Sequence, residues 1–329
     1  MKIANRVGCG LVIGAGIVLL AGCSTGGSQP AFAPGVSGPR AVGAGADFGP
    51  NRGRAWMSPD AKKKDLLYIS DAEANLVDVY SYPSDKLKGQ LSGFAGVQGL
   101  CTDKKGNIWI ANMSQGTMLE YKHGGTQPIA TLDDSGYDPE ACAVNVKTGD
   151  LAVANTNGGL AIYKGAKGTA QLYSDPNLTF GAYIGYDNAG NVFVDGQGTT
   201  NFVLAELPNG GSTMETIATS LDSGGLPDGI QWDGKYLTVG LSSSTQAIYQ
   251  LTVSGSSATT VGTTTLSGPR GIGQYLVLTK GKTQGKSVIV PELGSGGVVG
   301  YFKYPAGGTA TKSITGLENP LTVALSKGK

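Results

Sequence analysis

Leu67-Tyr68-Ile69-Ser70-Asp71 is the first of six short apolar runs that follow a Gly, Asn or Asp turn and end on a small or polar residue. The other five are Ile108-Trp109-Ile110-Ala111-Asn112, Leu151-Ala152-Val153-Ala154-Asn155, Val192-Phe193-Val194-Asp195-Gly196, Leu237-Thr238-Val239-Gly240-Leu241 and Val288-Ile289-Val290-Pro291-Glu292. Counted from the residues that open them, which are Asp65, Gly106, Gly149, Gly190, Gly234 and Gly285, the runs lie 41, 43, 41, 44 and 51 positions apart. Four short strands with their turns need about 40–50 residues, so this period predicts a β-propeller.

The strands of each predicted blade follow one order. An inner strand turns through Gly into the apolar run, and a third strand and a more polar outer strand follow. Inner strands are expected at 99–103, 141–145 and 229–233, and third strands at 77–80, 118–121, 160–163 and 298–301. Gly supplies 54 of 329 residues, and Gly-rich turns between short strands favour an all-β fold. The predicted fold is therefore all-β, a six-bladed β-propeller with four-stranded antiparallel blades.

Two segments compete to close the ring. Leu321-Thr322-Val323-Ala324-Leu325 has the pattern of an inner strand but no second strand follows it, and Trp56-Met57-Ser58-Pro59 also precedes a second strand. Either segment would complete the first blade and remove an exposed sheet edge. The sequence leaves both open.

Residues 1–22 have the features of a signal peptide. Lys2 and Arg6 precede an apolar run that is shorter than the ~18 residues of a spanning helix and ends in small residues. The run closes as Leu20-Ala21-Gly22-Cys23, which resembles the lipobox of bacterial lipoproteins. This resemblance implies cleavage before Cys23, its acylation (palmitate) and a membrane anchor. The alternative is an ordinary secretory signal with an incidental cysteine.

Residues 23–50 are then expected to form a lipidated cysteine and a flexible tether. Gly, Ser, Ala and Pro dominate this segment, and such a composition buries too little apolar surface to become ordered. The resemblance implies the bacterial cell envelope as the location, and Ser24 implies the outer membrane if the organism is diderm. The propeller is expected to occupy 51–329 as one domain.

The charge balance disfavours a nucleic acid partner. Removal of the signal peptide takes away Lys2 and Arg6, which leaves 23 basic side chains against 24 acidic ones. A near-neutral chain has no field that attracts nucleic acid or anionic lipid.

Polar residues recur in the loops that lead into the inner strands. These are Gln98, Glu140, Asp228 and Arg270, in Val97-Gln98-Gly99, Pro139-Glu140-Ala141, Pro227-Asp228-Gly229 and Pro269-Arg270-Gly271. Such loops of a propeller face the central channel, so we expect the four side chains to share one mouth and bind a ligand there. The structural alternative is that Glu140 pairs with Arg270 or water and that Asp228 forms an Asx-type turn.

Over about residues 54–326 the repeats resemble bacterial NHL-type propellers and, more loosely, the gluconolactonase-like family of six-bladed propellers. In that family, oxygen ligands for a divalent cation come from Pro-Asn-Gly and Pro-Asp-Gly contexts, and Asp228 matches such a context. Glu140 stands where a second ligand would lie, with Gln98 as a neutral third group, and this set suits Ca²⁺. The family's substrate-binding Arg-x-Asn-Asp-Gly stretch is absent.

A second polar set ends the apolar runs. Asp71, Asn112, Asn155 and Glu292 share the closing position in four blades. They form either a ring of ligand-binding groups or a set of side chains that bond the backbone of the following turn.

His123 and two cysteines complete the candidates. His123 is the single histidine and is expected at a rim hairpin, which disfavours a His-rich metal site and a Ser-His-Asp triad. Cys101 and Cys142 are expected on inner strands of consecutive blades. A disulfide and two buried free thiols are equally compatible with the sequence.

The sequence therefore favours a non-enzymatic, membrane-tethered module without a cofactor. Its expected partners are membrane lipid through Cys23 and a protein, glycan or small-molecule ligand at the channel mouth. The alternative is a divalent-cation-dependent lactonase or related hydrolase that uses Glu140 and Asp228.

Overall fold

The computed structural model describes residues 53–278, 287–293 and 296–328. Every described element lies within Phe32–Lys329, which forms one compact unit. The segments assigned above to the signal peptide and to the tether, with Cys23, lie outside the described residues. No helix in the described part of the chain is both long and apolar enough to cross a membrane.

Antiparallel sheets follow one another along the chain, and we name them A to F. Sheet A consists of β1 (Trp56–Met57), β4 (Lys86–Leu91), β3 (Leu76–Tyr82), β2 (Asp65–Asp71) and β26 (Pro320–Ser326), in that spatial order. Sheet B consists of β5 (Val97–Thr102), β6 (Ile108–Asn112), β7 (Thr117–Tyr121) and β8 (Pro128–Asp133). Sheet C consists of β9 (Pro139–Val144), β10 (Leu151–Asn155), β11 (Gly159–Tyr163) and β12 (Gln171–Ser174). Sheet D consists of β13 (Phe180–Tyr186), β14 (Val192–Gln197), β15 (Phe202–Leu207) and β16 (Glu215–Thr216).

Sheets E and F are joined into one nine-stranded sheet. Sheet E consists of β18 (Leu226–Trp232), β19 (Leu237–Ser242), β20 (Gln246–Ser254) and β21 (Ser257–Ser267), with β17 (Ala218–Thr219) parallel to β21. Sheet F consists of β22 (Leu276–Leu278), β23 (Ser287–Glu292), β24 (Val298–Lys303) and β25 (Gly307–Ile314). The junction is a short parallel pairing of Leu266 and Ser267 with Gly308 and Thr309. Helical structure in the described residues is limited to the 3-10 turns Ala61–Lys63, Met113–Gln115 and Lys164–Ala166.

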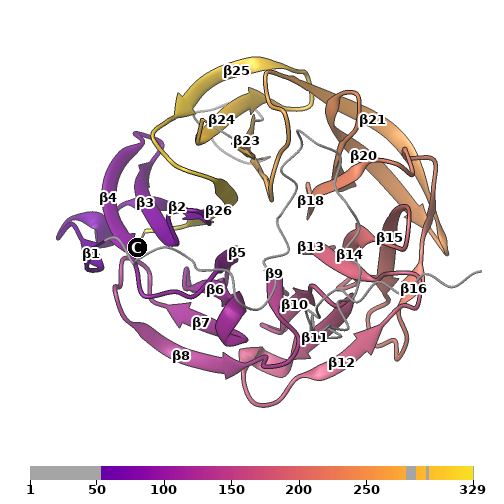
Figure 1. Ribbon diagram of the computed structural model, residues 1–329, viewed down its shortest axis with the longest axis horizontal. Coiled ribbons are helices and arrows are strands. Elements are labelled where there is room, and N and C mark those ends of the chain that lie inside the picture. The colour runs from indigo at the N-terminus through magenta and orange to yellow at the C-terminus, as the bar shows by residue number, and fades with distance from the viewer. Residues whose placement is uncertain (1–52, 279–286, 294–295, 329) are drawn as a thin grey trace, which may run out of the picture. The chain divides into compact units, whose positions relative to one another are not determined.

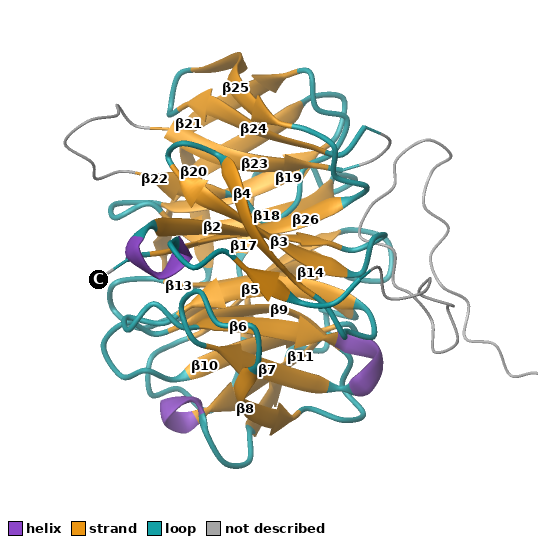
Figure 2. Cartoon of the chain, turned by 90° about the vertical axis from the view of Figure 1, so that its left-hand side faces the viewer, coloured by secondary structure: helices purple, strands orange, loops and turns teal. Residues whose placement is uncertain are grey.

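The sheets are arranged around a common centre, with β26, β5, β9, β13 and β18 innermost in sheets A to E (Figure 1). Viewed from the side, the described chain consists almost entirely of strands and loops, with only short helical turns (Figure 2). The inner strands also touch in sequence, since β26 contacts β5, β5 contacts β9, β9 contacts β13 and β13 contacts β18. The prediction of an all-β chain built from four-stranded antiparallel sheets is confirmed, and the arrangement is propeller-like.

The hydrophobic core lies between neighbouring sheets, which explains why the six runs are apolar throughout. In β6, Ile108 and Ile110 pack with residues of sheet A, whereas Trp109 and Ala111 pack with residues of sheet C. Successive side chains of a strand point to opposite faces, and here both faces are covered. A further cluster joins sheet F to sheet A, so the packing returns to its starting point.

The C-terminal segment closes sheet A. Strand β26 pairs antiparallel with β2, from Leu66 opposite Ser326 to Asp71 opposite Pro320. Trp56 and Met57 instead pair with Gln90 and Gly89 of β4 as a fifth, outer strand. Of the two segments that the sequence left open, 321–325 is therefore the inner strand.

Cys101 and Cys142 form a disulfide in the structure, with their Cα atoms 5.6 Å apart. The bond joins β5 to β9, the innermost strands of sheets B and C. Between the two alternatives from the sequence, the structure contains the disulfide.

Candidate functional site

The inner strands share a β-bulge near their first residues. In sheet C, Asn155 pairs with Pro139 and Ala154 with Ala141, so Glu140 is the extra residue. The same shift leaves Gln98 and Gly99 extra in β5, and Asp228 and Gly229 extra in β18. A bulge re-aims the side chain it carries. Three of the four residues predicted at the channel mouth thus occupy one structural position in three sheets.

A buried acidic cluster surrounds the phenol of Tyr183 on β13. Burial raises the pKa of Tyr183 well above its usual value, and the negative charges of Asp228, Glu140 and Asp195 raise it further. The four side chains come from sheets C, D and E and are at most 4% exposed. We name Glu140, Tyr183, Asp195 and Asp228 the acidic cluster.

Three polar atoms of the acidic cluster lack a partner among the described residues. Glu140 Oε2, the Tyr183 hydroxyl and Asp195 Oδ2 are buried without a hydrogen bond among the described residues. Asp195 Oδ1 accepts the Tyr183 backbone N–H at 3.0 Å. Leaving a buried polar group unpaired costs about 1–3 kcal/mol, so this group of atoms is a candidate binding site.

Two carboxyls of the cluster are protonated at neutral pH. Burial raises the pKa of Glu140 to about 8, and the nearby charge of Asp138 adds to the effect. Burial also raises the pKa of Asp228 to about 8, although hydrogen bonds from the Ser242 hydroxyl and the Ile272 backbone N–H favour its ionised form. Neutral carboxyl groups offer a donor as well as an acceptor to a ligand.

Asp195 and Tyr183 were absent from the sequence prediction. At the fourth position of the apolar runs, the other sheets carry Ser70, Ala111, Ala154, Gly240 and Pro291, and sheet D alone carries an acid. In sheet E a Cβ on Gly240 would lie 3.0 Å from Asp228 Cβ, so the glycine makes room for the bulge side chain. Sheet D reverses this pair, with Ala182 in the bulge and Asp195 on the second strand. The acid at the fourth position of the run in sheet D was therefore the feature of the sequence that could have identified Asp195.

Gln98 and Arg270 differ from the other predicted mouth residues. Gln98 is 3% exposed. A Cβ on the adjacent Gly99 would lie 2.7 Å from the Glu140 carbonyl oxygen, so the backbone beside Gln98 lies next to the backbone of Glu140. Arg270 is exposed in the loop before β22, and no ion pair between described residues joins it to Glu140. The structure therefore does not bring Arg270 into the buried set. Asp228 bonds Ser242 and Ile272 rather than forming a local Asx turn.

Asp71 and Asn112 serve the fold. Asp71 accepts the backbone N–H groups of Glu318 at 2.6 Å and Asn319 at 2.8 Å, which ties β2 to the loop before β26. Asn112 accepts the Ala95 N–H at 2.7 Å and donates to Gln115 and Thr117. Their polar atoms are thus engaged in backbone and turn contacts.

Asn155 and Glu292 sit at the same strand position with different surroundings. Asn155 is 0% exposed, and neither its Oδ1 nor its Nδ2 has a partner among the described residues. Glu292 is partly buried beside Gly300, and burial raises the pKa of its carboxyl. Four residues at one position therefore have three kinds of environment.

His123 lies at the other end of the inner strands. It stands in the turn between β7 and β8, and its Nδ1 is 2.6 Å from the Ser326 hydroxyl at the end of β26. Within residues 53–278, 287–293 and 296–328, no three His, Cys, Asp or Glu side chains gather as ligands for a metal ion.

Comparisons with known proteins support the fold alone. No protein-family model matches the chain, and no curated protein matches it. A protein of unknown function from Bacteroides caccae superimposes with a TM-score of 0.62 at 11% identity, over 80% of this chain and 99% of that one. A chain of a nidogen/laminin complex gives a TM-score of 0.62 at 12% identity, also over 80% and 99%.

Proposed function

We propose that this chain is an exported, lipid-anchored, six-bladed β-propeller of the NHL type that binds a ligand and catalyses no reaction. The six sheets and their closed packing support the blade count. The Cys101–Cys142 disulfide supports an oxidising compartment, because such bonds are rare in the cytosol. Cys23 would carry the acyl chain that places the protein in the cell envelope, in the outer membrane of a diderm organism.

The ligand site of this proposal is the acidic cluster. The observation that carries it is the gathering of unpartnered buried atoms at Glu140, Tyr183 and Asp195. Their desolvation lowers the stability of the unliganded protein, and a ligand that bonds them recovers that loss. Because Glu140 and Asp228 are protonated at neutral pH, an uncharged polar ligand or a polar protein segment fits better than a cation.

Native mass spectrometry of the full chain, extracted from its membranes in mild detergent, tests this proposal. The wild type should carry a bound species whose occupancy falls in Glu140→Gln and in Tyr183→Phe. The Tyr183 hydroxyl makes no hydrogen bond among the described residues, so Tyr183→Phe should not lower Tm. Loss of the species would then not reflect unfolding. Identical spectra of the wild type and both variants would contradict the proposal.

A divalent-cation-dependent lactonase is the second candidate. The observation in its favour is that Asp195 and Asp228 lie close enough for the charge of one to raise the pKa of the other carboxyl. A cation bound by Glu140 and Asp228 would favour the ionised form of both carboxyls and use the unpartnered Glu140 Oε2. Ca²⁺ would then be a cofactor held by Glu140 and Asp228.

Thermal melting with and without Ca²⁺ separates the two candidates. A true site raises stability by about 2.7 kcal/mol when the free ion is at a hundred times its Kd. Under the binding-module proposal the wild type should show no such rise. A rise that disappears in Asp228→Asn, together with Ca²⁺-dependent hydrolysis of a sugar lactone, would favour the hydrolase.

A further inference from the structure

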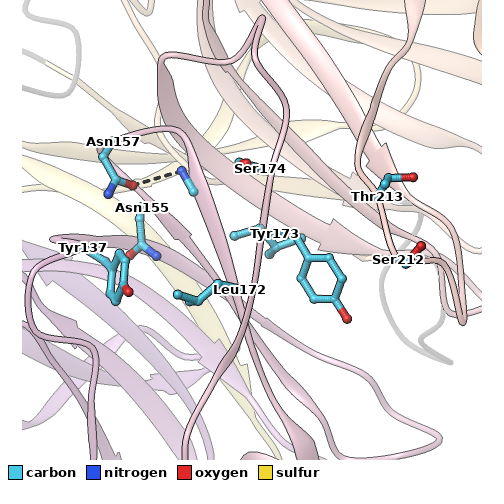
Figure 3. A pocket seen from close by; sticks show the side chains of 10 residues that line it. Tyr137, Asn155, Asn157, Leu172, Tyr173, Ser174, Ser212 and Thr213 are labelled. Atoms are coloured by element: carbon cyan, nitrogen blue, oxygen red, sulfur yellow. Dashed lines mark hydrogen bonds between the residues drawn. The ribbon is translucent and has the colours of Figure 1, made fainter.

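A pocket of about 480 Å³ lies between sheets C and D (Figure 3). Strand β12 contributes Leu172, Tyr173 and Ser174, and the loop between β15 and β16 contributes Ser212 and Thr213. Its volume falls in the usual range of small-molecule sites, about 300–1,000 Å³. None of the described residues that line it is charged.

Asn155 is the buried polar group of this pocket. It is 0% exposed, it lines the pocket, and both polar atoms of its amide lack a partner among the described residues. In sheets A and B, the residues at the same strand position, Asp71 and Asn112, have their polar atoms bound to the fold. The Asn155 amide is thus the one member of this comparison whose donor and acceptor both remain for a ligand.

The lining points to one class of ligand. An amide presents a donor and an acceptor side by side, which matches two neighbouring hydroxyl groups. Tyr137 and Tyr173 are amphipathic aromatic side chains, and Leu172 is 47% exposed, so the walls also offer apolar contact. A sugar ring combines hydroxyl groups on its edge with an apolar C–H face. An ionised ligand would find no counter-charge among these residues.

We propose that the pocket between sheets C and D binds a neutral oligosaccharide. The Asn155 amide bonds two hydroxyl groups at the inner end, and the hydroxyls of Ser212 and Thr213 bond the opposite edge. Tyr173 receives the face of one sugar ring, and Leu172, on the opposite side of β12, contacts a neighbouring ring. The site shares no residue with the acidic cluster and does not depend on the function proposed for that cluster.

Titration of the full chain with maltotriose, cellotriose and chitotriose, followed by calorimetry, tests the proposal. At least one of these sugars should bind at up to millimolar concentration. Leu172→Ser and Tyr173→Ala should each weaken that binding at least tenfold. Leu87→Ser is the matched control, because Leu87 is 46% exposed on the outer strand β4 of sheet A, far along the ring. It should bind the sugar as the wild type does.

Alanine variants of Asn155 and Asn112 distinguish a ligand contact from a structural role. Asn155→Ala should weaken sugar binding at least tenfold with little change in Tm, since its amide bonds nothing in the described chain. Asn112→Ala should lower Tm because it loses the bond from Ala95, yet leave sugar binding unchanged.

Three results would overturn the proposal. One is the absence of binding for all three sugars to the wild type. Another is binding that the Asn155, Leu172 and Tyr173 variants leave intact. The third is tighter binding of trialanine than of any of the sugars, which would assign the pocket to peptide.

Discussion

Glu140 and Asp228 are carboxyl groups that the fold keeps protonated at neutral pH. Their pKa values are about 8 in the folded chain, against ~4 for such groups in an unfolded chain. Between these values the folded protein holds protons that the unfolded chain releases. Facing them are Tyr183, Asp195 and Asp138, and none of these is a cation that would stabilise the ionised forms.

The free energy of unfolding should therefore fall as pH rises from ~4 to ~8. Each group contributes up to ~1.4 kcal/mol per pH unit in this range. The contribution is complete below pH ~4 and is lost as pH passes the folded-state pKa. Urea melts of the wild type from pH 4 to pH 9 would measure this slope.

The pH dependence of unfolding in the wild type is compared with that of a variant in which both carboxyl groups are replaced by amides. The double variant Glu140→Gln/Asp228→Asn should show a shallower slope, whereas Glu73→Gln, the same chemical change at an exposed residue, should keep the wild-type slope. Equal slopes in all three proteins would rule out proton uptake at these two groups.

Part of this site was predictable because a single polar residue recurs between Val or Pro and a small residue where the inner strands begin. That pattern located Glu140 and Asp228 and their neighbour Gln98, since each lies in a bulge that the repeat preserves. Arg270 has the same local pattern but lies before an irregular segment of sheet F, where Ile272 makes only an isolated bridge to Glu292. Which polar atoms remain unpartnered depends on neighbouring sheets, and no local pattern encodes that.

Strand β26 is the element on which ring closure depends. Truncation after Pro320 removes most of β26 and exposes β2 of sheet A, so the protein should aggregate or melt markedly earlier. Truncation after Ser326 keeps the strand and is the control. Deletion of the β1 residues Trp56 and Met57 should have a much smaller effect, because they add only two residue pairs at the outer edge. Equal melting of the Pro320 truncation and the wild type would contradict this.

The disulfide between β5 and β9 should stabilise the contact of sheets B and C. The bond closes a loop of 41 residues, and disulfides typically contribute about 2–4 kcal/mol through such loops. The Cys101→Ser/Cys142→Ser variant should lose about that much in chemical denaturation. Wild-type protein in reducing agent should behave like the variant, and an unchanged midpoint in both would contradict a structural role.

The order of strands within a sheet was predictable from the sequence, whereas the identity of the strand that closes the ring was not. Segments 56–59 and 321–325 have similar local patterns, and the choice between them depends on pairing with residues far away in the chain. The cysteine pairing was undecided for the same reason, since only the approach of β5 to β9 brings the two Cα atoms to 5.6 Å.

For the whole molecule, the predicted anchor is a single residue outside the described chain. Cys23→Ala should leave the sheets folded and release the protein from membranes, because Cys23 is the only lipid attachment in the proposal. Detergent-phase partitioning of both proteins, with circular dichroism to check folding, measures this. If the variant remained in the detergent phase, the lipoprotein assignment would be wrong.

The fold of the whole molecule was the most predictable level. Six apolar runs at a nearly constant spacing require a repeated unit, and burial of both faces of the second strands requires a sheet on each side. The ligand was not predictable at this level, because unrelated functions occur on propellers.

Because β26 completes sheet A, this sheet cannot form fully until nearly the whole chain has been synthesised. Asp71 receives its partner Asn319 only after another 248 residues have been added to the chain. At ~5–20 residues per second, synthesis of these residues takes roughly 12–50 s, and an exported chain completes its first sheet only after the last strand has also crossed the membrane. Ribosome stalling anywhere in that interval yields a product with an open strand edge, which proteases and chaperones recognise. Full-length synthesis is thus a condition for escape from cellular quality control.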